Sequence, residues 1–307
     1  MRRQNGYSVA SASGPVVCQA PTAFARLSPG ARRGAVACIG GLLLGVALLG
    51  IGGCAAVAPA DPPAATAAVS LQKPIPLFSA AAPGQRPIPG WVDWIIHPTK
   101  KRTQYAIVDQ AGLSVLRAQA DSSASGLAAV LNIDPLEQSI LEWRWRTESV
   151  IDGADNAVAA TEDAPLRLLL AFDGNKQSLP ARDRLFAERV KLISGRELPY
   201  ATLMYIWGNN HAVESILASP HTDRIRKLVV ENSPEQSRQW RSYRRDIVAD
   251  YQRAFGSPPG RLVGVALMTD TDNTASQVMA YYGDIRLLPS AAQTDSGLKQ
   301  GARLQAP

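Results

Sequence analysis

The sequence is poor in the residues and motifs from which an enzyme activity is most easily recognised. It has three cysteines and three histidines in 307 residues. His97, His211 and His221 do not have the short helical spacing of a zinc-binding pair. There is no G-x-S-x-G elbow, phosphate-binding loop or dinucleotide-binding fingerprint. No motif therefore predicts a zinc-dependent, nucleotide-dependent or serine-nucleophile activity.

Long apolar runs are also scarce, and the clearest one, residues 35–51, lies near the N-terminus. It follows Arg32 and Arg33, and it ends in two glycines immediately before Cys54. This arrangement resembles a bacterial lipobox, in which the cysteine carries a diacylglycerol thioether and becomes the first residue of the mature protein. A transmembrane anchor is the alternative, but glycines within the run weaken a helix. We therefore expect a lipoprotein signal peptide at residues 1–53 and a membrane anchor at Cys54.

Cleavage of this signal changes what the composition means. The first 53 residues contain five of the 32 Lys and Arg and none of the 26 Asp and Glu, so the mature chain would have a net charge of about +1. Such a charge provides no global field for gathering nucleic acid, and no nucleic-acid partner is predicted. Cys18 and Cys38 leave with the signal, so the only remaining cysteine is the lipidated one. We therefore predict no disulfide and no free thiol.

The chain after Cys54 divides into three parts by composition. Residues 54–72 are rich in Ala and Pro and are predicted to form a tether, residues 73–289 a β-sandwich domain, and residues 290–307 a disordered tail. Ala55 stands where an aspartate commonly marks lipoproteins retained in the inner membrane. We therefore expect an outer-membrane lipoprotein whose domain faces the periplasm, with the inner membrane as the alternative.

Alternating apolar and polar residues predict that the domain is mostly strand. In residues 141–146, Leu141, Trp143 and Trp145 alternate with Glu142 and two arginines, which is the pattern of a half-buried strand. Most of the similar runs are bounded by turn-forming residues. They lie at 91–96, 104–108, 113–117, 126–131, 166–172, 201–207, 225–230, 262–268 and 278–287.

Two segments, 181–194 and 235–255, have helical spacing instead. In the second, large apolar side chains recur at three- and four-residue steps and Gly256 follows the last one. These side chains are Trp240, Tyr243, Ile247, Tyr251 and Phe255. About ten strands with two inserted helices predict a jelly-roll-like β-sandwich. A doubly wound α/β sheet is disfavoured, because strands and helices do not alternate.

Seven motifs occur in order along the domain and carry a resemblance. They are DSSASGL (121–127), LEWRWR (141–146), EDAPLRLLLAF (162–172), YIWG (205–208), WRSYRRDIVADYQRAFG (240–256), MTDTDNT (268–274) and YYGDI (281–285). Together they resemble the bacterial family called domain of unknown function 3047. This family has no established activity, so the resemblance implies a fold and little chemistry. The YYGDI strand is also similar to the last strand of galactose-binding-like carbohydrate modules.

Oxygen-bearing side chains cluster after an apolar strand. Asp270, Asp272 and Asn273 place three potential ligands within four positions, as calcium would require. The spacing is not that of an EF-hand, because the expected glycine and the final glutamate are missing. The alternative is a polar turn whose Asp and Asn side chains bond to their own backbone. Calcium is therefore a possible cofactor, and no other is indicated.

Three further aspartates suggest carboxylate chemistry. Asp246 and Asp250 stand four residues apart in the second predicted helix and would share one face. Together with Asp284 they would form a carboxylate pair of the kind that glycoside hydrolysis uses. The alternative, which we favour, is ordinary ion pairs with Arg244 and Arg245 in a solvated or sheet-packed helix.

Arginines and tryptophans also lie close together in predicted strands. Planar guanidinium groups beside indole rings are suited to a carboxylate or a sugar ring. The arginines are Arg144, Arg146 and Arg167, and the tryptophans beside them are Trp143, Trp145 and Trp207. Core packing is the alternative for the tryptophans, and we favour it for Trp143 and Trp145.

These observations favour a lipid-anchored periplasmic β-sandwich that binds a glycan or another component of the cell envelope. Such a protein would carry aromatic or arginine side chains on a concave sheet face. Two alternatives remain. One is an enzyme that acts on envelope polysaccharide through Asp carboxylates. The other is a lipoprotein that binds a protein of an envelope complex through a contiguous apolar patch.

Overall fold

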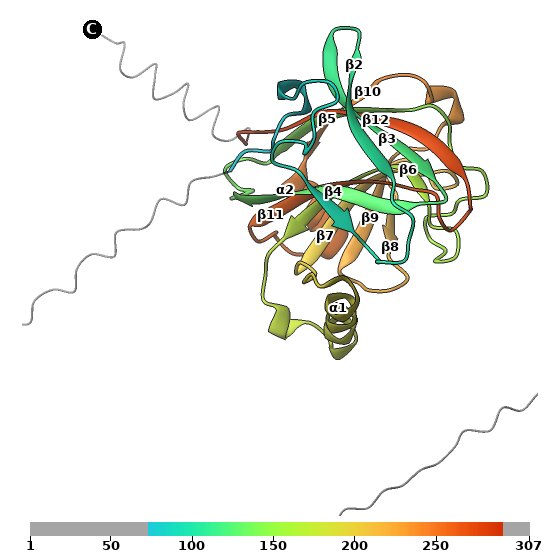
Figure 1. Ribbon diagram of the computed structural model, residues 1–307. Helices are drawn as coiled ribbons and strands as arrows, with labels where there is room; N and C mark the ends of the chain where they lie inside the picture. Colours follow the sequence, from blue (N-terminus) through green and yellow to red (C-terminus); the bar gives the residue numbers. More distant parts are fainter. Residues whose placement is uncertain (1–72, 291–307) are drawn as a thin grey trace, which may run out of the picture. The chain divides into compact units, whose positions relative to one another are not determined.

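The computed structural model describes residues 73–290, which contain the whole of the two sheets in Figure 1. The expected signal peptide, Cys54, the tether and all but the first residue of the expected tail lie outside these residues, so the predictions about them stay predictions. Within residues 73–290, no helix is long and apolar enough to span a membrane.

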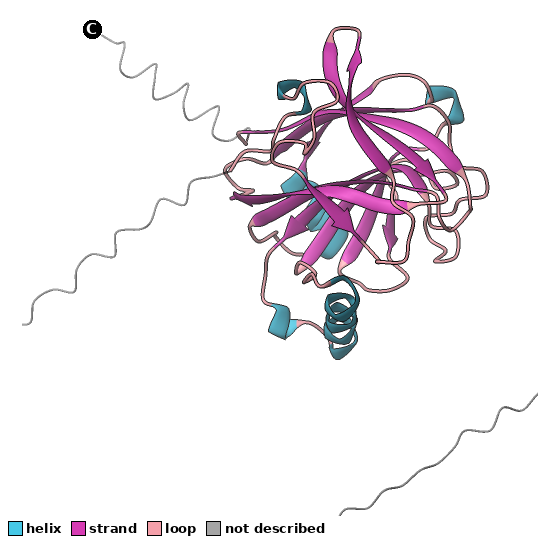
Figure 2. Ribbon diagram, viewed as in Figure 1, coloured by secondary structure: helices cyan, strands magenta, loops and turns pink. Residues whose placement is uncertain are grey.

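Figure 2 shows the strands in magenta, and they form two sheets. The larger sheet has seven strands in the order β1-β4-β11-β6-β7-β9-β8. Neighbouring strands are antiparallel except β7 and β9, which are parallel. In chain order the strands are β1 (Val92–Ile95), β4 (Ala124–Ile133), β6 (Ala164–Phe172), β7 (Ala201–Trp207), β8 (Ile216–Ala218), β9 (Ile225–Glu231) and β11 (Leu262–Asp270).

The smaller sheet has five strands in the order β10-β5-β12-β3-β2, and all its neighbouring pairs are antiparallel. Its strands are β2 (Gln104–Gln110), β3 (Leu113–Asp121), β5 (Ile140–Thr147), β10 (Arg241–Asp246) and β12 (Gln277–Leu288). The ten predicted strands are all present, most of them a few residues longer than predicted, while β8 and β10 were not predicted.

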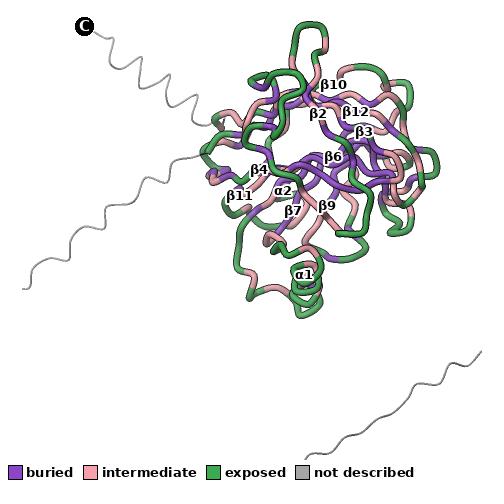
Figure 3. The backbone as a smooth tube through the Cα atoms, viewed as in Figure 1, coloured by how far each residue is buried: buried purple, intermediate pink, exposed green. Residues whose placement is uncertain are grey.

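The core lies between the two sheets, where buried side chains of their strands pack together. Figure 3 shows the buried segments in purple. Leu141, Trp143 and Trp145 of β5 contribute one side of the core, and Leu166 and Leu168 of β6 contribute the other. The prediction of a mostly β sandwich is therefore confirmed. Each sheet also has an outer face, and the candidate sites lie on these two outer faces.

The two helices agree only in part with the prediction. Helix α1 (Ala181–Ser194) has the predicted bounds, whereas α2 (Ile247–Phe255) is much shorter than predicted. The prediction was wrong for residues 241–246, which form strand β10 beside β5. There Tyr243 stacks on Trp143 inside the sandwich, and this packing outweighs the helical spacing of the sequence. Three short 3₁₀ helices complete the description: η1 (Phe78–Ala80), η2 (Lys176–Ser178) and η3 (Pro234–Gln236).

Candidate functional site

The outer face of the five-stranded sheet is rich in arginine and aromatic side chains. Tyr281 of β12 lies opposite Arg117 of β3 on one side and opposite Arg146 of β5 on the other. The Arg146 guanidinium carbon is 5.4 Å from the centre of the Tyr281 ring, and that of Arg144 is 4.8 Å from the Trp240 ring. The two rings are themselves 6.5 Å apart. We call these five residues the arginine face.

Only one of the three arginines of this face has a carboxylate partner among the described residues. Arg146 donates to Glu148 over 2.7 Å. The side chains of Arg117 and Arg144 have no hydrogen bond or ion pair with any other described residue, and the Nε of Arg117 is buried without a partner. Two guanidinium groups are therefore free to donate to a ligand, and one of them is held over an indole ring.

A glycine makes room for one of these arginines. A Cβ atom at Gly283 would lie 2.6 Å from Cγ and 2.9 Å from Nε of Arg144, so the arginine crosses β12 where no side chain is present. The register between β12 and β5 shifts between Tyr282 and Ile285, which brackets this glycine. The glycine of the YYGDI motif thus has a positioning role for Arg144.

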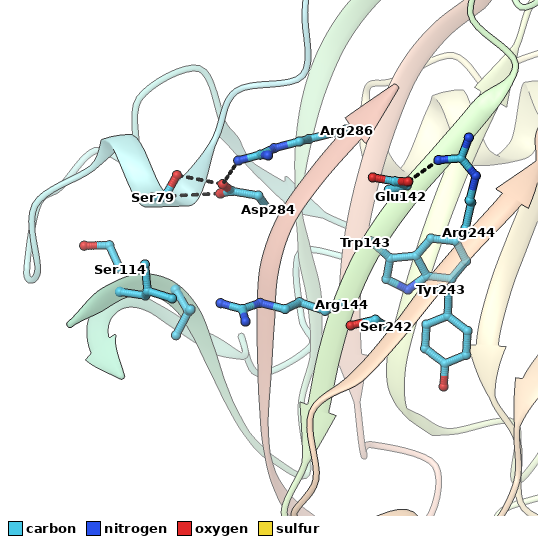
Figure 4. Close-up of a pocket in the computed structure, with 12 residues that line it drawn as sticks. Ser79, Ser114, Glu142, Trp143, Arg144, Ser242, Tyr243, Arg244, Asp284 and Arg286 are labelled. Carbon is cyan, nitrogen blue, oxygen red and sulfur yellow. Dashed lines mark hydrogen bonds and ion pairs between the residues drawn. The ribbon is translucent and has the colours of Figure 1, made fainter. Parts of the chain in front are cut away.

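The arginine face continues into a hollow of about 610 Å³, shown in Figure 4. Asp284 lines this hollow, and its carboxylate accepts from the backbone N of Ser79 (3.0 Å), from Ser79 Oγ (2.6 Å) and from Arg286 (3.1 Å). Glu142 pairs with Arg244, while Arg144 has no carboxylate. The wall also contains hydroxyl groups, and its residues are Ser79, Leu113, Ser114, Val115, Glu142, Trp143, Arg144, Ser242, Tyr243, Arg244, Asp284 and Arg286.

A second cavity, of about 560 Å³, lies on the outer face of the seven-stranded sheet and is lined mainly by apolar side chains. At one end Arg167 binds Asp270 through two hydrogen bonds of 2.8 and 2.9 Å, and both side chains are buried. Burial raises the pKa of Asp270 to about 6, with Arg167 opposing the shift. Nearby, burial lowers the pKa of Lys227, which pairs with Glu162. We call this cavity the apolar groove.

The predicted arginine and tryptophan residues therefore separate into three groups. Arg144 and Arg146 belong to the arginine face, and Trp143 reaches the wall of the hollow although most of its ring is buried. Arg167 lies on the other sheet, in the apolar groove. Trp145 and Trp207 are fully buried in the core. Core packing, which the sequence favoured for Trp143 and Trp145, accordingly describes Trp207 as well.

The three aspartates expected to act together have different partners. Asp246 caps α2 by accepting from the backbone N of Val248 and Ala249 (2.9 and 3.2 Å). Asp250 is buried and pairs with Arg245, and Tyr205 donates to it over 2.9 Å. Asp284 lies in the hollow. The prediction that Asp246 and Asp250 share one face of a helix was wrong, because Asp246 precedes the helix. Since each carboxylate is held by other groups, we do not propose hydrolysis through them.

The residues proposed for calcium lie close together, and Asp163 joins them. Oxygen atoms of Asp163, Asp270 and Asp272 are all within 4.8 Å of one another. Two of the three carboxylates already face a cation of the protein, since Asp270 binds Arg167 and Asp272 binds Lys100.

A turn is present at the same place, but its Asp and Asn side chains bond to other segments and not, as predicted, to their own backbone. The carboxylate of Asp163 accepts from the backbone N and the hydroxyl of Thr274, both over 2.7 Å. The amide of Asn273 donates to the carbonyl of Ala159 over 2.7 Å. Protein groups thus provide an alternative to a metal for each member of this cluster, and calcium binding stays a prediction.

Three members of the arginine face were missed by the sequence interpretation. Arg117 and Tyr281 lie in predicted strands, but their proximity depends on the register of two strands, β3 and β12, that are distant in the chain. Trp240 was assigned to the apolar stripe of a helix, whereas it lies directly before β10. The signal that was present is the alternation of the two strands, which places Arg117 and Tyr281 on a single face once their pairing is known.

Comparison with known proteins identifies a family. The family model described as "Protein of unknown function (DUF3047)" matches residues 89–286. No curated protein matches the sequence.

Solved structures with a similar fold include two glycoside hydrolases and a cyclase. The first is the xyloglucanase domain of NopAA, a type three effector from Sinorhizobium fredii, in complex with cellobiose (8% identity, 71% of this chain and 98% of that chain covered, TM-score 0.37). The second is endoglucanase 3 of family GH12 from Trichoderma harzianum (8% identity, 72% of this chain and 99% of that chain covered, TM-score 0.34). The third is a Stig cyclase from Fischerella sp. TAU (11% identity, 71% of this chain and 99% of that chain covered, TM-score 0.32). These scores and identities are too low to carry an argument about function.

Proposed function

The chain belongs to the DUF3047 family of proteins of unknown function, and we propose that its domain binds an acidic glycan of the cell envelope through the arginine face. The observation that carries this proposal is Arg144. Its guanidinium lies over the Trp240 ring, lines the hollow and has no carboxylate partner among residues 73–290. A planar guanidinium held in this way is arranged for two parallel hydrogen bonds to a ligand carboxylate.

The surroundings of Arg144 suit a sugar rather than a small inorganic anion. The hollow of about 610 Å³ is within the usual size range of small-molecule sites. Its hydroxyl groups, among them those of Ser114 and Ser242, provide donors and acceptors for sugar hydroxyls. Arg117 and Arg146 extend the cationic surface along the sheet beyond the hollow. A polymer with one carboxylate per few sugar rings would therefore contact several arginines at once.

The same proposal places the domain at the surface of a membrane. It rests on the lipobox-like segment that ends at Cys54 and on the Ala/Pro-rich residues 54–72. We propose that the lipidated protein is attached to the outer membrane and that its domain faces the periplasm. A lipid anchor would keep the arginine face close to envelope polymers, so that even a weak single-site affinity would suffice.

The test is a binding experiment with the full chain in a nonionic detergent. We expect retention on polygalacturonate and no retention on dextran, a neutral polymer of similar length. Arg144→Gln should weaken binding about tenfold, because a charge-assisted hydrogen bond is lost. Raising the salt concentration from about 0.05 M to about 0.5 M should also weaken it, since the charges are partly exposed.

The matched control is Arg184→Gln, which removes an exposed arginine of α1. Helix α1 lies beside the seven-stranded sheet, away from the arginine face. This variant should leave the affinity unchanged. An equal loss in both variants would mean that the polymer binds by net charge alone, and the proposed site would then be wrong. Equal retention on dextran would contradict the proposed ligand class.

A further inference from the structure

We propose that the apolar groove is a second binding site, which takes the fatty acyl chain of an ester lipid with the ester carbonyl against Arg167. This site is separate from the arginine face, because it lies on the outer face of the other sheet. Its cavity of about 560 Å³ is within the usual range of small-molecule sites.

Small residues on neighbouring strands form the floor of the groove. Ala128 of β4, Ala171 of β6 and both Gly264 and Ala266 of β11 line it. A Cβ atom at Gly264 would make only ordinary contacts, 3.4 Å from the carbonyl oxygen of Ala129 and 3.6 Å from Cβ of Ala171. The depth of the groove is thus due to short side chains on a continuous sheet, and longer side chains at these positions would fill it.

Larger apolar side chains and helix α1 form the walls. Trp94, Met204 and Met268 line the sheet side, and Phe186 and Val190 of α1 line the helix side. Methionine side chains adapt to flexible apolar partners, which suits an acyl chain. A sugar would find few hydrogen-bond partners on these surfaces, so its hydroxyl groups would be desolvated without compensation.

The helix that forms one wall is attached to the rest of the domain mainly at its first turn. Asp183 accepts from the hydroxyl of Thr222 over 2.7 Å and from the backbone N of Asp223 over 3.3 Å. Farther along, Phe186 and Val190 line the groove and are only half-buried, so the groove side of the helix is not fully covered by the protein. A ligand between α1 and the sheet would therefore add apolar contacts that the helix otherwise lacks.

The polar end of the groove determines the kind of head group. The Nε and Nη2 atoms of Arg167 bind the Asp270 carboxylate, whereas Nη1 has only the sulfur of Met204 as partner, at 3.6 Å. Sulfur is a weak acceptor, so this buried donor is poorly satisfied. The Arg167 charge is already matched by Asp270, and Lys227 is matched by Glu162. At Arg167 an uncharged acceptor such as an ester carbonyl thus fits better than a carboxylate, because the charges of Arg167 and of the nearby Lys227 are already paired.

The test uses the full chain at a fixed concentration of a nonionic detergent and a monoacylglycerol with a photoreactive group in its acyl chain. We expect cross-links to peptides that contain groove residues such as Met204, Met268 or Val190. Unlabelled monoacylglycerols should compete about fourfold better for each added methylene until the groove is full. The fatty acid of equal length should compete less well than the ester at neutral pH.

Two variants that fill the groove provide the decisive comparison. Ala266→Leu should lower cross-linking about tenfold, and Ala128→Leu, on the neighbouring strand, should act in the same way. The matched control is Ala106→Leu, at a half-buried alanine of β2 in the other sheet, which should have no effect. Circular dichroism will show that the variants are folded, and the two groove variants give independent readings.

Several results would overturn the proposal. One is labelling that is unchanged in both groove variants, and another is labelling spread over surfaces outside the groove. Equal or tighter binding of the fatty acid anion would contradict the uncharged head group. Cross-links between two copies of the chain across the groove would show that it is a protein interface. Retention on polygalacturonate does not depend on any of these outcomes, so the two sites are tested separately.

Discussion

Arg167 and Asp270 form a buried ion pair between adjacent strands, with Nε to Oδ1 at 2.8 Å and Nη2 to Oδ2 at 2.9 Å. Their side chains are 4% and 5% exposed. Desolvating two charges costs free energy that the hydrogen bonds only partly return, so such a pair is weak evidence for stability. The pair lies at the end of the apolar groove, where Asp270 holds Nε and Nη2 of Arg167 and leaves Nη1 with only the sulfur of Met204.

The first prediction concerns the pH dependence of this pair. Burial raises the pKa of Asp270 from 3.8 to about 6. The folded protein therefore holds this proton more tightly than the unfolded chain, so the resulting stabilisation is complete below about pH 4 and is lost as the pH rises through about 6. The free energy of unfolding should fall by roughly 3 kcal/mol across this range from Asp270 alone.

The measurement is a carbon NMR titration of the aspartate carboxyl groups. Asp270 should titrate with a midpoint near 6. The internal control is Asp121, whose pKa is lowered by its hydrogen bond with Lys101 and which should titrate below the ordinary range. A midpoint for Asp270 at or below that of Asp121 would show that the attraction of Arg167 outweighs burial.

The apolar and polar pattern was sufficient to predict ten of the twelve described strands, many of them through the side-chain period of two that a half-buried strand requires. The pattern gave the wrong structure where residues of a strand also had the spacing of a helix. Tyr243, Ile247 and Tyr251 have helical spacing, but Tyr243 belongs to β10 and the other two belong to α2. The local pattern does not contain the pairing of β10 with β5, and this pairing determines the structure of residues 241–246.

The second prediction separates the two aspartates that helical spacing had grouped. Asp246→Ala removes an exposed N-cap and should lower the free energy of unfolding by about 1 kcal/mol. Asp250→Ala leaves a buried Tyr205 hydroxyl and part of Arg245 without their acceptor, and it should cost about 3 kcal/mol. Urea denaturation of both variants at neutral pH measures the difference. Equal losses would contradict the separate roles that the contacts assign to them.

The candidate site was less predictable than the fold. Arg144, Arg146 and Asp284 were recognised as residues suited to binding, since charged side chains on strands are visible in one sequence. Their grouping was not predictable, because the arginine face is formed across three strands and a residue that precedes a fourth. The apolar groove left still less signal, since a row of alanines and glycines on an outer face does not differ in sequence from ordinary strand positions.

The third prediction tests the glycine beneath Arg144. Gly283→Ala would place a methyl group 2.6 Å from Cγ of Arg144, so the arginine must move. The affinity for polygalacturonate should fall nearly as far as in Arg144→Gln. The free energy of unfolding should fall by about 1–2 kcal/mol, because the nearest obstructing atom is Cγ, close to the backbone of Arg144, and the side chain must change rotamer to clear it. Isothermal titration and urea denaturation of the same variant measure the two effects.

The control for this substitution is Gly264→Ala, which adds the same methyl group on the other sheet with only ordinary contacts. It should leave polygalacturonate binding unchanged. If Gly283→Ala bound polygalacturonate as tightly as the parent protein, the position of Arg144 over Trp240 would not matter for the ligand. This result would contradict the proposed function, which depends on that position.

The fourth prediction concerns the anchor. Cys54→Ser should leave the N-terminal segment uncleaved and the protein without its lipid, because the serine hydroxyl does not replace the thiol that receives the diacylglycerol group. Two buried acyl chains hold a protein stably at a bilayer. Fractionation of cells and the mass of the purified protein measure both effects.

Cys38→Ser is the matched control and should behave as the parent protein, since that residue lies within the segment to be removed. Retention and cleavage of Cys54→Ser to the same extent as the parent would exclude the lipid anchor, and the proposed envelope ligand would then lose the localisation on which it depends.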